Sequence, residues 1–576
     1  MNVNLIAVAL SAHGLETIDS KFARAITRVE NVFKSPDSWH YQNGRIRAYN
    51  ANRISGTWSE DPVFADDDVA IAFSQPPIPN SATIEASNYW TLVKQIVDQD
   101  RFQELQPNYF GYAVSANGDV KVWADILGFG RCYYIQTDDF FAASNHIGAL
   151  TEFIQGRISV NESAVAKFAG AGFFMNNDSP ISGITRFSEA QVFSIDSAGA
   201  IHENRYDGFT GMFEPVDEET GYAETLEQLQ LVSRNIARLV DRVPTVFLSG
   251  GRDSRMTAGV WLSAVQRANV VTMGALPRES EIASELMRIY LEERGGEDSS
   301  EIRHTVTLPN PAEITMPLEE RLQRSFAMWD GDAAPGNMKR NVAIPSGRSV
   351  IQIGGVGGEI VHGYYYSRPG QIEKLREESD PMLAARRSFG VAQLTESAHR
   401  AIDEAFSFAG RKADDLGVVG LERLDFLYLT EKLRRWGNQA LGSTSAVLLA
   451  APAFVRLAFS VTPEDKVSKA VPKEIVRRAI PQWAEVETYK ASGDDSKRLM
   501  RQGTCTYQTD PDGFWGVWEE SHHWKKFLNA DSLVKFEELV RNEEATPVHE
   551  SWMNRAIWID QIYRHVAQLN TERGVL

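Results

Sequence analysis

Two patterns of hydrophobic positions divide the chain. Up to about residue 215, short apolar runs alternate with turn residues, as in "DVAIAF" (68–73) and "RCYYIQ" (131–136). The dipeptide Asn117-Gly118 separates two such runs and is typical of a β-hairpin turn. From Glu224 onward, the apolar residues of "ETLEQLQLVSRNIARLV" recur at helical spacing instead. The pattern therefore predicts a strand-rich first part and a second part that opens with a helix.

The second part alternates between strand-like and helical segments. The apolar runs "TVFL" (245–248), "NVVTMG" (269–274) and "SVIQIGG" (349–355) are separated by helical patterns such as "ESEIASELMRIYLEERGG" (279–296). Strands that alternate with longer helices are typical of a parallel sheet covered by helices. Beyond residue 395 the pattern is mostly helical. A polar, glycine-containing stretch at 205–222 marks the predicted boundary, so we expect domains at 1–215 and 222–576.

Length and composition fit a globular protein with more than one hydrophobic core. The chain has 576 residues, of which 43% are hydrophobic and 24% are charged. Its formal net charge of -18 argues against a general binder of nucleic acid or of anionic membrane surfaces. No apolar stretch approaches the ~20 residues that a membrane-spanning helix needs. We therefore expect neither nucleic acid nor a membrane as a partner.

The cysteine content and the first residues indicate the cellular compartment. Only Cys132 and Cys505 are present, which is too few for a disulfide framework. The opening stretch "MNVNLIAVALSAHGLETIDS" has a short apolar run without a basic leader or a clear cleavage site. This favours a buried first strand over a signal peptide. We expect a cytoplasmic protein in a reducing environment.

The stretch "FLSGGRDSR" (247–255) carries the clearest chemistry. Where a strand ends and a helix begins, backbone N–H groups lack partners and the helix dipole favours anions. The two glycines allow a phosphate to approach closely, and the hydroxyls of Ser249 and Ser254 add donors. Asp253 would repel a polyphosphate unless it holds Mg²⁺. We interpret the turn as an ATP site; the alternative is a glycine-rich turn in which Asp253 or Ser254 caps the helix.

The string S-G-G-x-D-S resembles the nucleotide loop of the ATP pyrophosphatases, and its surroundings extend the likeness over nearly the whole chain. The stretches "VWADILGFGRCYYIQTDDFFAASNHIGAL" (122–150) and "IQIGGVGGEIVHGYYY" (351–366), and the segment that ends at Lys490, resemble the class B asparagine synthetase family. That family includes β-lactam synthetases and lasso-peptide cyclases. The resemblance implies an α+β N-terminal glutaminase-like domain, an Ntn-hydrolase-type sandwich, and an α/β C-terminal domain of the ATP-pyrophosphatase type.

The same resemblance implies a set of site residues. Lys490 is the candidate for the catalytic lysine that stabilises negative charge on the acyl oxygen; the alternative is a solvated surface lysine. Glu359 is the candidate for proton abstraction or metal binding; the alternative is a salt-bridge or capping residue. Asp253 would bind the metal, with ATP and Mg²⁺ as cofactors. The main chain around Met273 would meet the adenine. The implied ATP-binding residues are Leu248, Ser249, Gly250, Gly251, Asp253, Ser254, Met273, Gly354 and Gly355.

Three positions depart from the family pattern. Members with glutaminase activity carry a nucleophilic cysteine at residue 2, where this chain has Asn2, so we expect the first domain not to hydrolyse glutamine. Gly355 stands where asparagine synthetases have an acid and β-lactam synthetases a tyrosine. Gly358 stands where the family commonly has a metal-binding aspartate. These glycines argue against true asparagine synthesis.

The expected function is that of an ATP-dependent ligase that forms an amide bond. A carboxylate would be adenylated with release of pyrophosphate, and an amine would then displace AMP without glutamine hydrolysis. Intramolecular closure of the lasso-peptide or β-lactam type stays open, as does a nucleotide-binding protein without catalysis. The expected partner is a small-molecule or peptide substrate that supplies the carboxylate or the amine. A homodimer and partner biosynthetic proteins stay open as assemblies.

Overall fold

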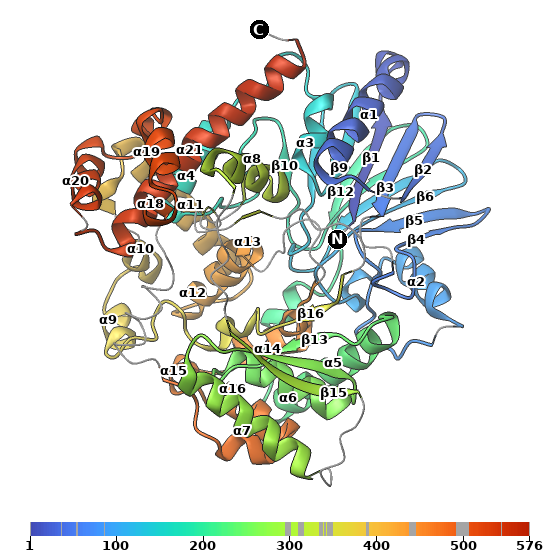
Figure 1. Cartoon of the computed structure of the whole chain (residues 1–576). Helices are drawn as coiled ribbons and strands as arrows, with labels where there is room; N and C mark the ends of the chain where they lie inside the picture. The colour runs from blue at the N-terminus through green and yellow to red at the C-terminus, as the bar shows by residue number, and fades with distance from the viewer. Residues whose placement is uncertain are drawn as a thin grey trace.

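The computed structural model describes residues 2–35, 37–52, 56–85, 87–293, 301–308, 316–332, 338, 341–342, 349–387, 391–436, 445–490, 506–542 and 544–574. Three sheets and many helices make it a mixed α/β protein. In Figure 1 the two antiparallel sheets lie at the upper right, and the parallel sheet lies at the bottom. Helices of the C-terminal part lie at the upper left.

The two antiparallel sheets pack face to face. Alternate residues of both, such as Ile6 and Val8 in one and Tyr112 and Val122 in the other, form the buried core between them. The first sheet has the order β10 (Thr185–Arg186), β8 (Tyr133–Gln136), β9 (Phe140–Ser144), β1 (Val3–Ala9), β3 (Ile46–Asn52), β2 (Asp37–Asn43). The second has the order β12 (Ile201–Arg205), β11 (Gln191–Ile195), β7 (Val120–Ala124), β6 (Phe110–Ser115), β5 (Val69–Phe73), β4 (Val63–Ala65). The predicted hairpin turn at Asn117-Gly118 connects β6 to β7, and Gly118 has a φ of +87° there.

Helices cover the outer faces of this sandwich. Helix α1 (Ala12–Phe33) begins after Ser11, whose hydroxyl accepts a hydrogen bond from the N–H of Gly14. Its buried residues Ile18, Phe22 and Val29 recur at helical spacing and pack on the first sheet. Helix α2 (Tyr89–Asp98) packs in the same way on the outer face of the second sheet. The result is four layers, with helices outside and two sheets inside.

The third sheet is parallel and follows the helix α5 (Glu218–Leu239). That helix begins before the predicted Glu224, because the side chain of Asp217 accepts from the N–H of Thr220 and caps it there. The strand order is β15 (Ile302–Thr307), β14 (Ala268–Met273), β13 (Thr245–Phe247), β16 (Gln352–Ile353), β17 (Ser445–Ala446). Helices α6 (Asp253–Ala264) and α7 (Pro277–Glu293) connect the first three strands in sequence. The prediction of a parallel sheet with intervening helices is therefore confirmed.

The described chain beyond residue 395 is mostly helical, as predicted, with the short strand β17 between α13 and α14. Helices α14 (Pro452–Ser460) and α16 (Ala470–Ala479) pack against α5 and α6. The last helix, α21 (Pro547–Glu572), extends toward α1 at the top of Figure 1. The other helices from α8 onward are α8 (Leu318–Trp329), α9 (Gln371–Arg376), α10 (Pro381–Arg386), α11 (Glu396–Asp415), α12 (Glu422–Leu427), α13 (Arg434–Trp436), α15 (Pro463–Ser468), α18 (Thr506–Thr509), α19 (Pro511–Glu519) and α20 (Ala530–Arg541). Among the described residues, none of the helices combines the length and apolar character needed to cross a bilayer.

Buried ion pairs join the sandwich to the helical part. Arg186 of β10 and Arg435 of α13 each lie 2.8 Å from a carboxylate oxygen of Asp332. Arg131, just before β8, lies 3.3 Å from a carboxylate oxygen of Asp330. All of these side chains are at most 4% exposed, so each charge depends on its partner for stabilisation.

Candidate functional site

The parallel sheet reverses its strand order between β13 and β16. From β13 the chain proceeds to β14 and β15 on one side, and then returns to β16 and β17 on the other. At such a switch point the loops after the two strands diverge, and open α/β sheets bind ligands in the crevice outside the carboxyl ends of their strands. The two loops here are residues 248–252 and 354–357. They are the two glycine-rich stretches that the sequence analysis singles out.

The loop after β13 folds back on the first turn of α6. The N–H of Ser249 donates to the hydroxyl of Ser254 over 3.0 Å, and the two hydroxyl oxygens lie 2.9 Å apart. The N–H of Gly251 donates to the hydroxyl of Ser249 over 3.1 Å. Arg252 occupies the N-cap position and provides no side-chain cap. Neither Asp253 nor Ser254 is therefore the cap of this helix, and the hydroxyls shape the turn instead.

Gly355 and Gly358 of the second loop lie directly against Asp253. A Cβ atom on Gly355 would come within 2.6 Å of the Cβ of Asp253 and 2.7 Å of the backbone nitrogen of Ser254. A Cβ atom on Gly358 would come within 2.5 Å of Oδ1 of Asp253. Any larger residue would displace the first turn of α6. From the sequence these glycines look like lost catalytic groups, whereas in the structure they allow the two loops to touch.

A histidine and a glutamate approach Asp253 at the same place. Nε2 of His362 lies 2.8 Å from Oδ1 of Asp253, an ion-pair distance without hydrogen-bond alignment. Glu359, in the short helix Gly358–Val361, accepts a hydrogen bond from the N–H of Gly357 over 3.1 Å. Burial and the negative charge of Asp253 raise the pKa of Glu359. A partly buried carboxyl group with a raised pKa, beside another carboxylate, is a candidate for proton transfer.

These acidic residues fit a Mg²⁺ ion that arrives with a nucleotide. Mg²⁺ is usually bound by one or two carboxylates together with substrate phosphates and water. Asp253 and Glu359 supply two carboxylates, and Oδ1 of Asp253 is a buried oxygen with no hydrogen bond to the rest of the described chain. Among the described residues, no three His, Cys, Asp or Glu side chains form a cage for a metal. The donors therefore suit a metal that takes its other oxygen ligands from phosphates.

Lys490 ends a segment that packs on the first loop. The N–H of Tyr489 donates to the carbonyl of Gly250 over 2.8 Å. A Cβ atom on Gly250 would come within 3.0 Å of the Cβ of Tyr489, so glycine permits this close approach. Lys490 is exposed and lines a cavity of about 430 Å³ together with Arg278 and Tyr489. The structure thus brings the predicted lysine beside the predicted loop.

Lys469 is a cation at this edge of the sheet that sequence analysis missed. Its Nζ donates to the carbonyl of His362 over 2.7 Å. Burial and the nearby Arg252 lower the pKa of Lys469 to about 8. With Arg252, Arg255 and Lys473 it lines a cavity of about 260 Å³ beside the first loop. No local sequence signal marks this lysine, because its position depends on how α16 packs against α6.

The other predicted residues lie at the same edge but differ in what they expose. Met273 is the last residue of β14 and is 49% exposed. Gly354 follows β16, and a Cβ atom there would meet only the ring of Phe247, at 3.8 Å. Leu248 is buried, and its N–H donates to the carbonyl of Val271 over 3.0 Å. The side chain of Leu248 therefore belongs to the hydrophobic core.

Asn2 lies in a buried network of amides at the start of β1. Its backbone N–H donates to the carbonyl of Ser74 over 2.7 Å, and its side-chain nitrogen donates to Oδ1 of Asn50 over 3.1 Å. Its carbonyl accepts from the side chain of Asn145 over 2.8 Å. The backbone nitrogen of residue 2 is thus held in a peptide hydrogen bond, and the side chain is an amide without nucleophilic character.

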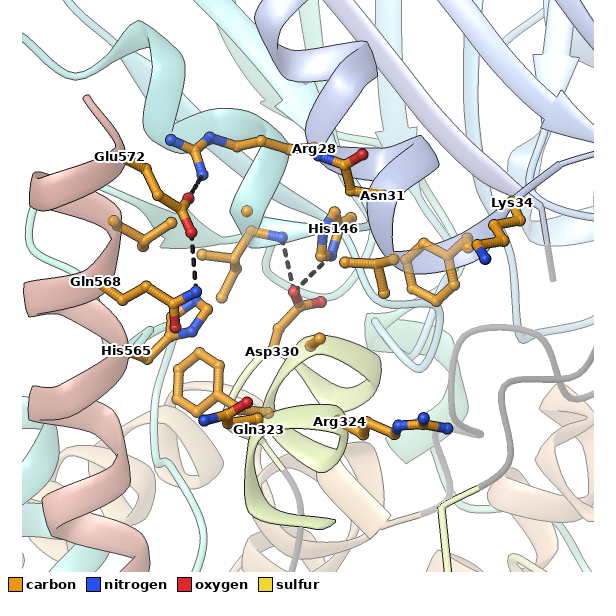
Figure 2. A pocket seen from close by; sticks show the side chains of 17 residues that line it. Arg28, Asn31, Lys34, His146, Gln323, Arg324, Asp330, His565, Gln568 and Glu572 are labelled. Carbon is orange, nitrogen blue, oxygen red and sulfur yellow. Dashed lines mark hydrogen bonds and ion pairs between the residues drawn. The ribbon is translucent and has the colours of Figure 1, made fainter. Parts of the chain in front are cut away.

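A larger cavity, of about 590 Å³, lies between the sandwich and the helical part. Figure 2 shows that Arg28 of α1, His146, Asp330 and His565 of α21 line it. Nδ1 of His146 lies 2.8 Å from Oδ1 of Asp330. Burial and the nearby His146 lower the pKa of His565 to about 4. None of the residues predicted to bind ATP lines this cavity.

Comparisons with known proteins add little to this geometry. No family model matches the chain, and no curated protein does. Among solved structures, a glutamine phosphoribosylpyrophosphate amidotransferase from B. subtilis, complexed with ADP and GMP, matches with 8% sequence identity and a TM-score of 0.21. The match covers 47% of this chain and 81% of that one. A TM-score this low supports no conclusion about this chain.

Proposed function

We propose that the protein is an ATP-dependent, AMP-forming ligase of the asparagine synthetase type that makes an amide bond without hydrolysing glutamine. The substrate carboxylate attacks the α-phosphate of ATP, pyrophosphate leaves, and an amine then displaces AMP from the acyl adenylate. One observation carries the proposal. The two glycine-rich loops that resemble the family's nucleotide motifs meet at the switch point of the parallel sheet, in contact through Gly355, Gly358 and Asp253.

The residues of the first loop would bind the polyphosphate. The unpaired N–H groups at the start of α6 and the hydroxyls of Ser249 and Ser254 would donate hydrogen bonds to the phosphate oxygens and stabilise their negative charge. Arg252 and Lys469 add positive charge beside them. Asp253 would hold Mg²⁺, which supplies charge neutralisation when it is bound. Together these groups would stabilise pyrophosphate as it leaves.

The second half-reaction needs a proton acceptor and a cation. The incoming amine loses a proton, for which Glu359 is the candidate because burial and Asp253 raise its pKa. Negative charge builds on the acyl oxygen, for which Lys490 is the candidate because its neighbour Tyr489 is bonded to Gly250. These two residues therefore take the roles that the family resemblance implies.

The substrate class stays at the level of a small-molecule or peptide carboxylate and an amine. The buried amide network around Asn2 supports a sandwich that serves as a scaffold and not as a glutaminase. Amine or free ammonia would then come from solution or from the substrate itself. If the amine belongs to the same substrate as the carboxylate, the reaction is an intramolecular closure, as in β-lactam or lasso-peptide formation.

A second candidate function is nucleotide binding without catalysis. The contact between His362 and Asp253 favours it, because an imidazole occupies one side of the proposed metal ligand. It predicts that ATP binds and that no pyrophosphate is released. The ligase predicts both binding and release.

Pyrophosphate release separates the two candidates. The protein is incubated with ATP, Mg²⁺ and a panel of carboxylates and amines, and pyrophosphate and AMP are measured together. In the ligase, Asp253→Asn lowers release by at least about 100-fold, because the metal loses its carboxylate. The matched control is Asp241→Asn, an exposed aspartate before β13 on the opposite edge of the sheet. If calorimetry shows that ATP binds and no combination of carboxylate and amine releases pyrophosphate, the non-catalytic function is supported instead.

A further inference from the structure

Arg255 is a buried arginine whose hydrogen bonds within the described chain all go to main-chain carbonyls. It lies in the first turn of α6, one residue after Ser254, and is 3% exposed. One terminal nitrogen donates to the carbonyl of Val486 over 2.7 Å and to that of Trp483 over 3.3 Å. The other donates to the carbonyl of Glu487 over 2.8 Å and to that of Gly250 over 3.4 Å.

This set of acceptors is unusual for a buried guanidinium. Most buried charges are stabilised by an opposite charge, whereas the four acceptors of Arg255 are neutral. Burial, with the repulsion of Arg252, lowers the pKa of Arg255 to about 10. A buried arginine that served only to fill space would be replaceable by an apolar side chain. The fixed fork of the guanidinium instead joins two separate segments of main chain.

Those two segments are the predicted phosphate loop and the approach to Lys490. Three of the acceptors belong to residues 483–487, and the fourth is in the loop. The carbonyl of Gly250 also accepts from the N–H of Tyr489 over 2.8 Å. Trp483 anchors the far end of the segment, since it is fully buried and its indole N–H donates to the carbonyl of Leu286 over 2.7 Å.

We propose that Arg255 is a positioning residue, which clamps the main chain of 483–487 onto the phosphate loop and thereby sets the place of Lys490. The inference rests on the proposed function for the role of Lys490, but the clamp itself is a property of the folded chain. It also couples the two halves of the site, because one side chain holds both the loop that would bind phosphate and the lysine that would stabilise the acyl oxygen. A displacement of either segment would then displace the other as well.

Hydrogen exchange and kinetics of Arg255→Ala test the clamp. The amide of Tyr489 reports docking directly, since its acceptor is the loop carbonyl of Gly250. We expect peptides over residues 484–490 to exchange at least about tenfold faster in the variant, with α5 unchanged. We expect kcat for pyrophosphate release to fall by at least about tenfold while KM for ATP changes by less than about threefold, because the loop amides remain.

The matched control is Arg267→Ala. Arg267 follows the other end of α6, and its hydrogen bonds to the described residues also go to carbonyls, those of Val240 at 3.3 Å and Asp241 at 2.9 Å. It should leave the exchange of residues 484–490 as in the wild type. Arg255→Ala also leaves a guanidinium-sized space lined by carbonyls, so millimolar guanidinium chloride should restore both protection and rate. Arg255→Lys, whose single ammonium cannot reach both segments, should lie between the wild type and Arg255→Ala and covers the case in which the alanine variant fails to fold.

The outcomes separate the clamp from the reaction. Unchanged exchange of residues 484–490 in Arg255→Ala or in Arg255→Lys, or an equal acceleration in Arg267→Ala, would overturn the positioning role. Faster exchange without any change of kcat would also overturn it, because Lys490 would then not depend on the clamp. Absence of pyrophosphate release from the wild-type protein would instead remove the proposed reaction and leave the exchange result intact.

Discussion

The buried amide network at the start of β1 differs from the edge of the parallel sheet in whether its buried polar groups are hydrogen-bonded. In the network, Asn2, Asn4, Asn50 and Asn145 are buried, and each donates or accepts hydrogen bonds within the group. At the edge of the parallel sheet, Oδ1 of Asp253 is buried without a hydrogen bond to the described chain. A hydrogen-bonded network stabilises one arrangement. The carboxylate oxygen of Asp253, which faces the imidazole of His362 without hydrogen-bond alignment, keeps a lone pair that a cation can use. One region is therefore fixed by its own hydrogen bonds, whereas the other has a carboxylate oxygen that the described chain leaves without one.

The same contrast extends to charge. The side chains of Asn2, Asn4, Asn50 and Asn145 are amides, which do not titrate, so a change of pH does not alter their charge. At the edge of the parallel sheet, burial raises the pKa of Glu359 and lowers the pKa of Lys469. Opposite shifts in neighbouring groups are what acid–base chemistry near neutral pH requires.

The largest effect is expected for Gly355→Ala, which closes the contact between the two loops. A methyl group there would overlap the backbone of α6, with atoms of Asp253 and Ser254 within 2.7 Å. We expect unfolding free energy to fall by about 3 kcal/mol, because the overlap is with main chain that cannot rotate away. Pyrophosphate release should fall by about 100-fold, because Asp253 moves. The measurements are chemical denaturation and a pyrophosphate assay.

Gly354→Ala is the matched control for stability. It is the preceding residue, and its Cβ would meet only the ring of Phe247, at 3.8 Å. We expect it to unfold within about 0.5 kcal/mol of the wild type. Equal destabilisation by the two substitutions would show that the tight packing against Asp253 is not what holds the loops together.

Much of the parallel sheet and its loops could be predicted from the sequence, since apolar runs and glycine-rich turns are local signals. The apolar runs 245–248 and 269–274 predict strands, and the structure has β13 at Thr245–Phe247 and β14 at Ala268–Met273. The contacts of His362, Lys469 and Arg255 could not be, because each depends on the packing of segments distant in sequence. Gly355 and Gly358 were interpreted as missing side chains, because a sequence does not reveal that Asp253 fills the space.

The second largest effect is expected for Asn50→Leu in the amide network. Asn50 accepts from the side chain of Asn2 over 3.1 Å and donates to the carbonyl of Phe73 over 3.1 Å and to Oδ1 of Asn4. Leucine leaves these buried groups without a partner, so we expect a loss of about 2–3 kcal/mol of unfolding free energy. Denaturation measures it, with the exposed Asn43→Leu on β2 as the control.

Pyrophosphate release per folded molecule should be unchanged in Asn50→Leu. That result would support a sandwich that serves as a scaffold for the reaction. A stable Asn50→Leu protein that has lost pyrophosphate release would instead give the sandwich a direct role in the chemistry.

A smaller effect is expected for Lys469→Met, which removes a cation from the edge of the parallel sheet. Because burial and Arg252 lower the pKa of Lys469 to about 8, its ammonium is charged below pH 8 and neutral above it. The wild-type rate should therefore decline as pH rises through 8, while Lys469→Met should be about tenfold slower below pH 8 and lose that decline. The exposed Lys535→Met on α20 serves as the control. If the rate of Lys469→Met still declines as pH rises through 8, the decline is caused by a group other than Lys469.

The smallest effect is expected for His565→Gln in the large cavity between α1 and α21. Burial and the nearby His146 lower the pKa of His565 to about 4, so the folded protein holds the ring neutral at pH values where the unfolded chain, at 6.5, already protonates it. Stability from the neutral ring is complete above pH 6.5 and is lost as pH falls toward 4. Because the ring is partly exposed, we expect the loss of unfolding free energy between pH 6.5 and 4 to be smaller in His565→Gln than in the wild type, by about 1–2 kcal/mol. Denaturation across pH 4 to 7 measures it, with the exposed His13→Gln as the control. Identical pH dependence in His565→Gln and the wild type would mean that other groups carry the acid sensitivity of the interface between the sandwich and the helical part.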